Sequence, residues 1–539
     1  MLVGKEKAKG MLCMMLHAHL PFVRHPEYDD FLEEDWLYEA ITETYIPLLD
    51  MMNGLLRDGV DFRLTMSMTP PLTAMLRDGL LQQRYLRNIE KLIELAEKEV
   101  ARTRVSQREC YDTAQMYLRK FRRCREVFVD QNGMDLTRGF RAVMETGKLE
   151  IITCGATHGF FPLMQTVPGA IRAQLAVATE SHRQAFGRSP RGIWNAECGY
   201  FKGLDRYLAK EKIRFFFVDT HGILNASCRP AYGVYAPLYT PTGVAAFGRD
   251  IESSKSVWSS EEGYPGDANY REFYRDIGYD LDLDYIRPYI HESGFRKNTG
   301  IKYYRITGKT VYKRPYVERW AQDRAATHAG NFMYNRQQQV KHLAGFMGDR
   351  LPIVVSPYDA ELFGHWWYEG PDFLNYLFRK IHFDQNELDL CTPSEYLKRY
   401  SVNQVAYPSM SSWGANGYCS VWLESSNDWI YRHLIKMAER MVELANTYRF
   451  ENDGLRIRAL NQAAREVLLA QSSDWAFIMK TRTMVEYAVK RTKEHVNWFT
   501  ELYYMLKENR VDEGFVSYLE GKNNIFSFMD YHVYANPED

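Results

Sequence analysis

The chain has 539 residues, 45% hydrophobic and 25% charged, which is the composition of a globular protein long enough for two or three domains. Its formal net charge of -1 gives no electrostatic reason to expect a nucleic acid or an anionic membrane as partner. The eight cysteines include no Cys-x-x-Cys pair, so we expect free thiols in a reducing cytoplasm and no structural zinc site.

Short apolar runs typical of buried strands recur along the chain, at residues 11–16, 61–66, 149–153, 192–194, 215–218 and 352–356. The first run is too short for a membrane span and is followed by no cleavage signal, so it is interpreted as a strand rather than a leader. Longer amphipathic segments separate the runs. This alternation predicts an α/β fold with a parallel sheet or barrel, whose catalytic face lies beyond the strand ends.

Three regions interrupt or follow this pattern. Residues 76–139 are charged, with apolar side chains at helical spacing, and are interpreted as a helical insertion. Residues 223–310 are irregular and rich in Tyr, Gly and Pro, which is typical of a functional excursion over a barrel mouth. From about residue 398 the pattern is helical. We therefore expect a catalytic barrel from 1–75 and 140–397, with a C-terminal helical domain at 398–539 that completes the cleft.

Two carboxylates follow predicted strands and have aromatic neighbours. Glu197 comes three residues after Trp194, and Asp359 follows the 352–356 run and precedes Trp366 and Trp367. Carboxylates can act as acid, base or nucleophile, and indole faces can stack on sugar rings, so the pattern suggests a carbohydrate-active site. The structural alternative is that such an Asp caps the next turn and that the tryptophans pack in the core.

Two histidines, His17 and His19, follow the first predicted strand, and His158 follows the third. The His-x-His spacing suits a metal, for which Asp359, His158 and His365 would be the further ligands. The same residues could instead hydrogen-bond sugar hydroxyls, or they could be histidines satisfied within the core.

Five segments occur in the order of the signature regions of glycoside hydrolase family fifty-seven, and the chain resembles that family over nearly its whole length. They are residues 17–22 (HAHLPF), 156–163 (ATHGFFPL), 192–198 (GIWNAEC), 356–366 (SPYDAELFGHW) and 471–477 (QSSDWAF). Residues 258–276 and 412–429 are most similar to the 1,4-alpha-glucan branching enzymes of the family.

The resemblance implies a distorted (β/α)7 barrel and a retaining mechanism on α-1,4-glucans, without metal or cofactor. It implies that Glu197 is the nucleophile and Asp359 the general acid/base. Retention needs the two carboxyl groups about 5–5.5 Å apart, and the acid needs a pKa raised by burial or by a neighbouring carboxylate. The other implied substrate-binding residues are His17, His19, His158 and Asp474 near the cut, Trp258, Trp413 and Trp422 as stacking surfaces, and a lid tyrosine in 228–237, which is Tyr232 or Tyr235.

The expected activity is the transfer of α-1,4-glucan chains to 6-hydroxyl groups, forming the α-1,6 branches of a glycogen-like polymer. The alternatives are an α-amylase or 4-α-glucanotransferase of the same fold, a metal-dependent polysaccharide deacetylase built on His17, His19 and Asp359, and a non-catalytic glucan-binding protein. The expected partner is α-1,4-glucan, with no nucleic acid or membrane, and the protein is expected to be a cytoplasmic monomer.

Overall fold

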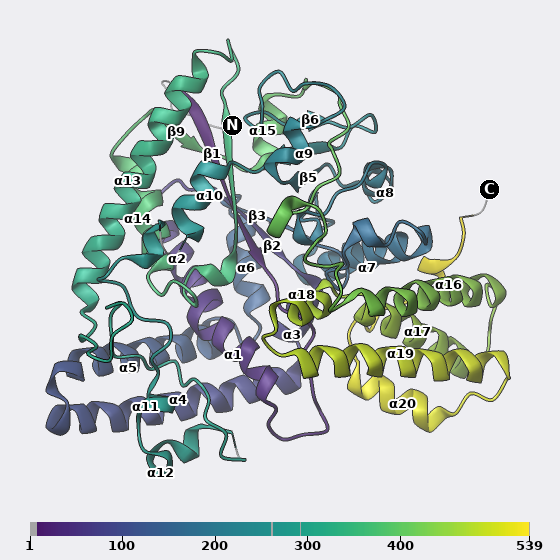
Figure 1. Ribbon diagram of the computed structural model, residues 1–539, viewed down its shortest axis with the longest axis horizontal. Helices are drawn as coiled ribbons and strands as arrows, with labels where there is room; N and C mark the ends of the chain where they lie inside the picture. Colours follow the sequence, from purple (N-terminus) through teal and green to yellow (C-terminus); the bar gives the residue numbers. More distant parts are fainter. Residues whose placement is uncertain (1–7, 260–261, 292, 538–539) are drawn as a thin grey trace.

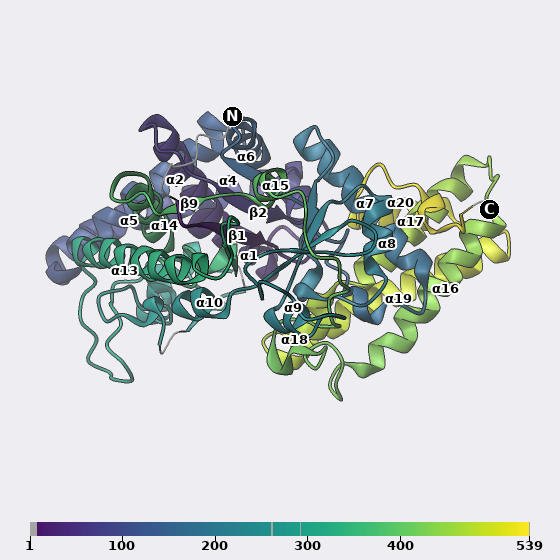
Figure 2. The ribbon, with the colours of Figure 1, turned by 90° about the horizontal axis from the view of Figure 1, so that it is seen from above.

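The computed structural model describes residues 8–259, 262–291 and 293–537 and has an α/β fold with a helical C-terminal region (Figure 1). Ser260, part of the 258–276 segment, lies outside the described residues. Two perpendicular views place the long helices α4 and α5 at one end of the molecule and helices α16, α17, α19 and α20 at the other (Figures 1 and 2). The sheets lie between these two groups of helices.

The first sheet has the strand order β3-β2-β1-β8, with β9 also paired to β1, and all of its pairings are parallel. Its strands are β1 (Gly10–Ala18), β2 (Leu64–Met68), β3 (Leu149–Ile152), β8 (Ile353–Asp359) and β9 (Leu388–Leu390). His17 near the end of β1 lies opposite Ser67 on one side and Asp359 on the other. The carboxyl ends of these three strands therefore meet at one edge of the sheet.

The second sheet has the order β4-β5-β7-β6. Its strands are β4 (Gly192–Ile193), β5 (Phe215–Val218), β6 (Leu238–Tyr239) and β7 (Ala245–Gly248), and β6 alone among them runs antiparallel. Thr153, directly after β3, forms a parallel bridge with Ile193 of β4. At the other side, the Asp250 amide after β7 donates to the Val355 carbonyl of β8 at 2.9 Å. The two sheets are therefore in contact at two places, between β3 and β4 and between the end of β7 and β8.

Side chains from both sheets share one buried cluster. Alternate residues of β1 enter this cluster, and the residues between them pack against helices, as the two-residue period of a strand requires. The shared cluster includes Met11, Cys13, Met15, Ile152, Trp194, Phe217, Phe247, Ile353 and Val355. A core common to both sheets fixes the position of one set of strand ends relative to the other.

Helices follow most strands, and the first ten precede residue 260. They are α1 (Asp35–Ala40), α2 (Ile46–Arg57), α3 (Pro70–Leu76), α4 (Gly79–Ser106), α5 (Tyr111–Glu126), α6 (Leu136–Glu145), α7 (Pro168–Phe186), α8 (Leu204–Lys210), α9 (Thr220–Leu224) and α10 (Ile251–Trp258). Asp78 caps α4 by accepting hydrogen bonds from the amides of Leu80 and Leu81, both at 3.0 Å. A π-helix, Ile41–Tyr45, joins α1 to α2.

The remaining helices include those of the C-terminal region. They are α11 (Ile277–Asp280), α12 (Leu283–Ile286), α13 (Glu318–Ala344), α14 (Gly370–Phe383), α15 (Pro393–Arg399), α16 (Tyr431–Thr447), α17 (Gly454–Ala470), α18 (Ser473–Thr481), α19 (Val485–Lys507) and α20 (Glu513–Lys522). Residues 400–427 carry a single short 3₁₀ turn, Ala415–Gly417, and otherwise form loops. The helical pattern expected from about residue 398 therefore begins later, near Asp428.

All six predicted strands are present, and the largest shift is in β2, which starts at Leu64 rather than at residue 61. The region 223–310, expected to be irregular, also contains β6, β7 and three helices. Strand β7 was missed because its sequence, AAFG, has no β-branched residue. All eight cysteines lie within the described residues and are free, as expected. Within the described residues, no helix is both long and apolar enough to cross a membrane.

Candidate active site

Glu197 lies on the 3₁₀ turn Ala196–Cys198 that directly follows β4, and its backbone is left-handed, with φ 62°. Such a conformation is costly for a residue with a side chain and is typical of functional sites. Glu197 is 9% exposed, and both oxygens of its carboxylate accept hydrogen bonds. Trp413 Nε1 donates to Oε2 at 2.7 Å, and Ser473 Oγ donates to Oε1 at 3.0 Å. Both donors orient Glu197 from segments far along the chain.

Asp359 is the last residue of β8 and lies beside His17 in the register of the sheet. No described residue forms a hydrogen bond with its carboxyl group. Glu361 follows on the next turn, where its Oε1 accepts hydrogen bonds from Tyr45 Oη at 2.5 Å and from the His19 amide at 3.3 Å. The carboxyl group of Asp359 is thus free to act on a ligand, with a second carboxylate fixed nearby.

The environments of the two candidate carboxyl groups separate their pKa values. Burial, followed by the charges of Glu361 and Glu197, raises the pKa of Asp359 well above its ordinary value. Burial also raises the pKa of Glu197, to about 7, but the hydrogen bond from Trp413 opposes that rise. A proton shared between the two groups therefore resides on Asp359, and Glu197 is the group that ionises.

Three histidines form one cluster at the ends of β1 and β3. His17 Nδ1 lies 2.6 Å from Ser67 Oγ, and its Nε2 lies 2.9 Å from His158 Nε2. His158 Nδ1 lies 2.7 Å from Ser473 Oγ. Burial lowers the pKa of both His17 and His158 far below the ordinary value, so both rings are neutral. Their tautomers are therefore linked through one chain of hydrogen bonds that ends at Ser473 and Glu197.

His19, the third member, forms an ion pair with Asp474. Its Nε2 lies 3.0 Å from Asp474 Oδ2, and its Nδ1 lies 2.9 Å from Thr69 Oγ1. Although burial opposes both shifts, the ion pair raises the pKa of His19 and lowers that of Asp474. The site therefore contains a fixed positive and a fixed negative charge beside the two catalytic candidates.

His19, His158 and Asp474 are also the described residues whose ligand atoms lie close enough to hold a metal, within 4.8 Å of one another. The two rings stack with centroids 3.8 Å and planes 14° apart. The lone pair of a ring nitrogen lies in the ring plane, so stacked rings direct their lone pairs side by side rather than towards one ion. Both nitrogens of each ring already have hydrogen-bond partners. This arrangement of the two rings does not suit a metal ion.

Three tryptophans extend from Glu197 to the surface. Trp194 is fully buried, and its ring meets that of Trp413 edge-on at 4.9 Å. Trp413 meets Trp258, at the end of α10, edge-on at 6.4 Å. Trp258 is 37% exposed. Trp413, which is hydrogen-bonded to Glu197, and Trp258 beyond it therefore form an aromatic surface between this carboxylate and the solvent.

The sequence model of a protein family, described as glycosyl hydrolase family 57, matches residues 13–347, which is more than half of the chain. The chain belongs to glycosyl hydrolase family 57. A second model, described as 1,4-alpha-glucan branching enzyme, C-terminal, matches residues 433–534. Membership of family 57 and the similarity to branching enzymes show that the protein is an enzyme of the glycoside hydrolase or glycosyltransferase class.

Individual relatives cover nearly the whole chain. The 1,4-alpha-glucan branching enzyme TK1436 of Thermococcus kodakarensis is 31% identical over 96% of this chain and 77% of its own length. The crystal structure of AmyC from Thermotoga maritima, described as a novel alpha-amylase, is 48% identical with a TM-score of 0.92 and covers 98% of this chain and 100% of its own. A family 57 branching enzyme from Pyrococcus horikoshii is 30% identical with a TM-score of 0.87, covering 98% and 97%.

Two residues expected to contact substrate in this family 57 protein have positions that do not suit that role. Trp422 is 1% exposed and stacks on Phe160 at 4.7 Å, so neither face of its indole is available to a sugar. The Tyr235 hydroxyl lies 3.4 Å from Asp250 Oδ1 and from Gln339 of α13, so it points towards that helix. Tyr232 packs beside Arg350, in the loop before β8. The Tyr235 carbonyl also accepts a hydrogen bond from the Ile353 amide at the start of β8, at 2.9 Å, so contacts with the region around β8 hold this segment.

Sequence reasoning missed Ser473, Ser67, Tyr45 and Glu361 as parts of the family 57 site. Two of them had a signal, since Ser473 and Glu361 stand beside residues that were singled out, Asp474 and Asp359. Ser67 was detectable only as a polar residue inside a buried strand. Tyr45 comes from a helix with no motif, so its contact with Glu361 depends on the tertiary structure alone.

Proposed function

We propose that the protein is a 1,4-alpha-glucan branching enzyme that acts by a retaining double displacement on a glycogen-like polymer. One observation carries the proposal: Ser473, within the segment that matches the branching-enzyme C-terminal model, donates to the carboxylate of Glu197. The same segment supplies Asp474, which holds His19. The part of the chain most indicative of branching is therefore also the part that orients the candidate nucleophile.

In the first step, the ionised Glu197 attacks the anomeric carbon of a glucose unit. Asp359, protonated because of its raised pKa, gives its proton to the departing 4-oxygen. The glycosidic bond breaks, one part of the chain leaves with a new 4-hydroxyl, and the other part is bound to Glu197 as an ester. His17, His19, His158 and Asp474, which lie together beside the two carboxyl groups, are proposed to bind the hydroxyl groups of the sugars on either side of the cut.

In the second step, Asp359, now a carboxylate, removes the proton from the 6-hydroxyl of an acceptor glucan. That oxygen attacks the anomeric carbon, the ester bond to Glu197 breaks, and an α-1,6 link forms with the original anomeric configuration. Water competes with the acceptor for the same ester. Trp413 and Trp258 are positioned to hold the acceptor by stacking, which favours transfer over hydrolysis.

We also propose that the two sheets are parts of one distorted (β/α)7 barrel. The bridge between Thr153 and Ile193, the hydrogen bond from Asp250 to Val355 and the shared core support closure. Seven parallel strands, β8-β1-β2-β3-β4-β5-β7, would form it. The proposed division is a barrel from 1–75 and 140–397, an insertion at 76–139 and a C-terminal domain at 398–539.

A second candidate function is α-glucan hydrolysis. It is favoured by the 48% identity with AmyC of Thermotoga maritima, which is described as an alpha-amylase. Both activities share the first step and differ only in whether water or a 6-hydroxyl captures the ester.

Amylose treated with the enzyme distinguishes the two activities. Branching lowers the iodine absorbance with little increase in reducing ends, and a debranching enzyme then releases short side chains. Hydrolysis increases the number of reducing ends in proportion to the loss of iodine absorbance. A product that yields no side chains on debranching contradicts the branching proposal. Glu197→Gln, which keeps the shape but removes the attacking charge, is expected to lose several orders of magnitude in both reactions.

No metal is expected to take part, because the two carboxyl groups account for both steps and the histidine nitrogens have partners in the protein. Elemental analysis of the purified protein and activity after treatment with a chelator test this. One stoichiometric transition metal, with activity lost on chelation and restored by that metal, contradicts it.

A further inference from the structure

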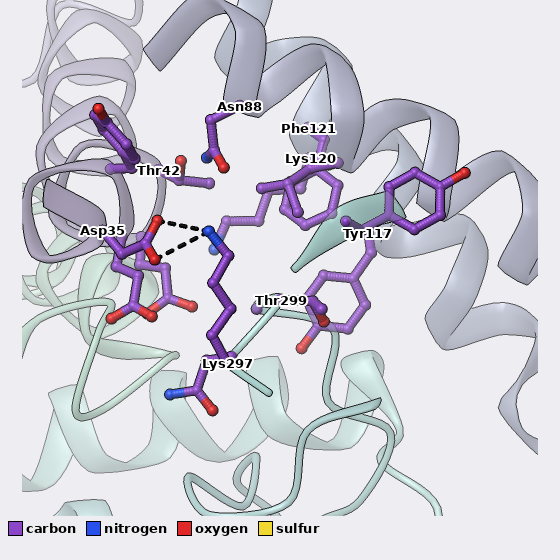
Figure 3. Close-up of a pocket in the computed structure, with 15 residues that line it drawn as sticks. Asp35, Thr42, Asn88, Tyr117, Lys120, Phe121, Lys297 and Thr299 are labelled. Carbon is purple, nitrogen blue, oxygen red and sulfur yellow. Dashed lines mark hydrogen bonds and ion pairs between the residues drawn. The ribbon is translucent and has the colours of Figure 1, made fainter. Parts of the chain in front are cut away.

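A polar pocket lies away from Glu197 and Asp359, between the helices of the 35–45 segment, α4, α5 and the 297–300 loop (Figure 3). Figure 3 shows Lys120 from α5, Asn88 from α4 and Lys297 from the loop reaching into the same space. Tyr117 and Phe121, both nearly fully buried, form part of its wall. The pocket thus has an aromatic side, charged groups from three segments and the amide of Asn88 from α4.

Some of these charged groups already have partners. Lys297 Nζ donates to both carboxylate oxygens of Asp35, at 2.8 and 2.9 Å. Glu43 accepts a hydrogen bond from His365 Nδ1 at 2.6 Å and faces Arg271 at 3.7 Å. These pairs hold the walls in place and leave little capacity for a ligand.

Other polar groups of the pocket have no such partner. No described residue forms a hydrogen bond or an ion pair with the side chain of Lys120, Glu39 or Asn88. The Lys120 ammonium lies 4.0 Å from the centre of the Tyr368 ring, which orients the group and leaves N–H donors for a ligand. Burial lowers the pKa of Lys120 to about 8 and raises that of Glu39 to about 7. The pocket therefore has unused donors and acceptors in a partly desolvated space.

The charge of the lining selects the class of ligand. Asp35, Glu39 and Glu43 oppose an anion, and Lys120 and Lys297 oppose a cation. A neutral ligand with many hydroxyl groups can accept from Lys120 and Asn88, donate to Glu39 and lie against the aromatic wall. We propose that this pocket is a second, non-catalytic carbohydrate site that holds a glucose unit of the glucan. That the ligand is a glucan rests on the proposed function. That it is a neutral molecule with many hydroxyl groups rests on the residues that line the pocket.

The pocket and the catalytic residues share one short element. The π-helix Ile41–Tyr45 contributes Thr42 and Glu43 to the pocket, and its last residue, Tyr45, donates to Glu361 beside Asp359. A glucan bound in the pocket would therefore contact the same π-helix whose Tyr45 holds Glu361, two residues after Asp359. Because such a site adds binding without changing the reacting groups, its loss should affect long glucans more than short ones.

The test measures how many maltotriose molecules bind, by calorimetric titration of Glu197→Gln protein, in which turnover is blocked. Two classes of site are expected. Adding Lys120→Met, which keeps the length of the side chain but removes its donors, should weaken one class about tenfold or more, as expected for loss of a hydrogen bond from a charged group. Glu39→Gln, nearly identical in shape, should weaken the same class. Arg119→Met, one residue away and exposed, is the matched control and should keep both classes.

A single class of site before any pocket substitution overturns the proposal, as do two unchanged classes in properly folded Lys120→Met and Glu39→Gln proteins. Melting temperatures equal to that of the Arg119→Met protein establish the folding. The branching proposal is tested separately, by the products that wild-type enzyme forms from amylose. If those products lack α-1,6 links while the second class responds as expected, the function fails and the carbohydrate site stands.

Discussion

At the scale of single residues, the surroundings of Glu197 and Asp359 give their carboxyl groups different hydrogen-bond partners and different pKa values. Glu197 accepts hydrogen bonds from Trp413 and Ser473, which favour its charged form. Asp359 has no hydrogen-bond donor among the described residues and lies within range of two other carboxylates. The first is therefore suited to attack carbon, and the second to carry a proton.

Asp359→Ala should slow the cleavage of amylose far more than that of a maltosyl fluoride, because fluoride leaves without a proton and a sugar oxygen does not. The measurement is kcat/KM on both substrates. Losses of two or more orders of magnitude on amylose are expected, on the basis of what general acids contribute in other enzymes. Similar losses on both substrates would argue against the acid role.

Activity should depend on pH through the same pair. Attack needs ionised Glu197, whose pKa is about 7, so the rate should fall as the pH drops below that value. The alkaline side of the profile should follow the higher pKa of Asp359, since the rate falls when that group loses its proton.

Ser473→Ala removes a donor that stabilises charged Glu197, so the acidic limb of the kcat/KM profile should move to higher pH by about one unit. Ser106→Ala, at the exposed end of α4, is the control and should leave the profile unchanged. A limb that stays in place, or moves to lower pH, would show that Ser473 does not act on Glu197 in solution.

At the scale of elements, the segment 412–429 has two kinds of tryptophan within one loop. Trp413 reaches Glu197, whereas Trp422 is buried against Phe160. Their different positions come from the turn between them, where Asn416 and Cys419 have left-handed backbones. An aromatic-rich loop near an active site is therefore not uniformly a binding surface.

Trp422→Ala should destabilise the protein by about 3–5 kcal/mol, the usual cost of removing a buried Trp, and should lower branching and hydrolysis together. Trp258→Ala, at an exposed position, should leave stability nearly unchanged and shift the products from α-1,6 links towards hydrolysis. Denaturant unfolding and product analysis of both proteins test this. A Trp422→Ala protein of normal stability with a selective loss of branching would restore Trp422 as a sugar-binding residue.

At the scale of the whole molecule, the C-terminal region contacts residues of the candidate site. Gly159 and Ser472 form an antiparallel bridge, and the Ser473 amide donates to the His158 carbonyl at 3.1 Å. Asp474 then pairs with His19 after β1. The start of α18 thus contacts the segments that follow β1 and β3 in the first sheet. Activity should depend on these contacts.

Asp474→Asn should lower both stability and activity, because it leaves the buried His19 without its counter-ion. The raised pKa of His19 means that the ion pair stabilises fully below about pH 6.5 and less as pH rises through the folded-state value. The lowered pKa of Asp474 means that the pair stabilises above about pH 3.8 and less as pH falls further. The difference in unfolding free energy from wild type should be largest between these limits, and a difference independent of pH would contradict the pairing.

The sequence by itself determined the positions of the six predicted strands, the order of the motifs and the choice of Glu197 and Asp359 as candidates. This information is local: the two-residue period of a strand and the chemistry that follows it can be read within a dozen residues. Family membership could be inferred in the same way and was confirmed by the comparisons.

Only the tertiary structure decided what surrounds those residues. The donors to Glu197 stand 216 and 276 residues away along the chain, so no local pattern connects them. The burial of Trp422 depends on Phe160, and the direction of Tyr235 on α13. The pKa order of the two carboxyl groups follows from burial and from charges brought together by folding. Residue type limits which chemistry is possible, whereas long-range packing sets the distances and desolvation that assign each role.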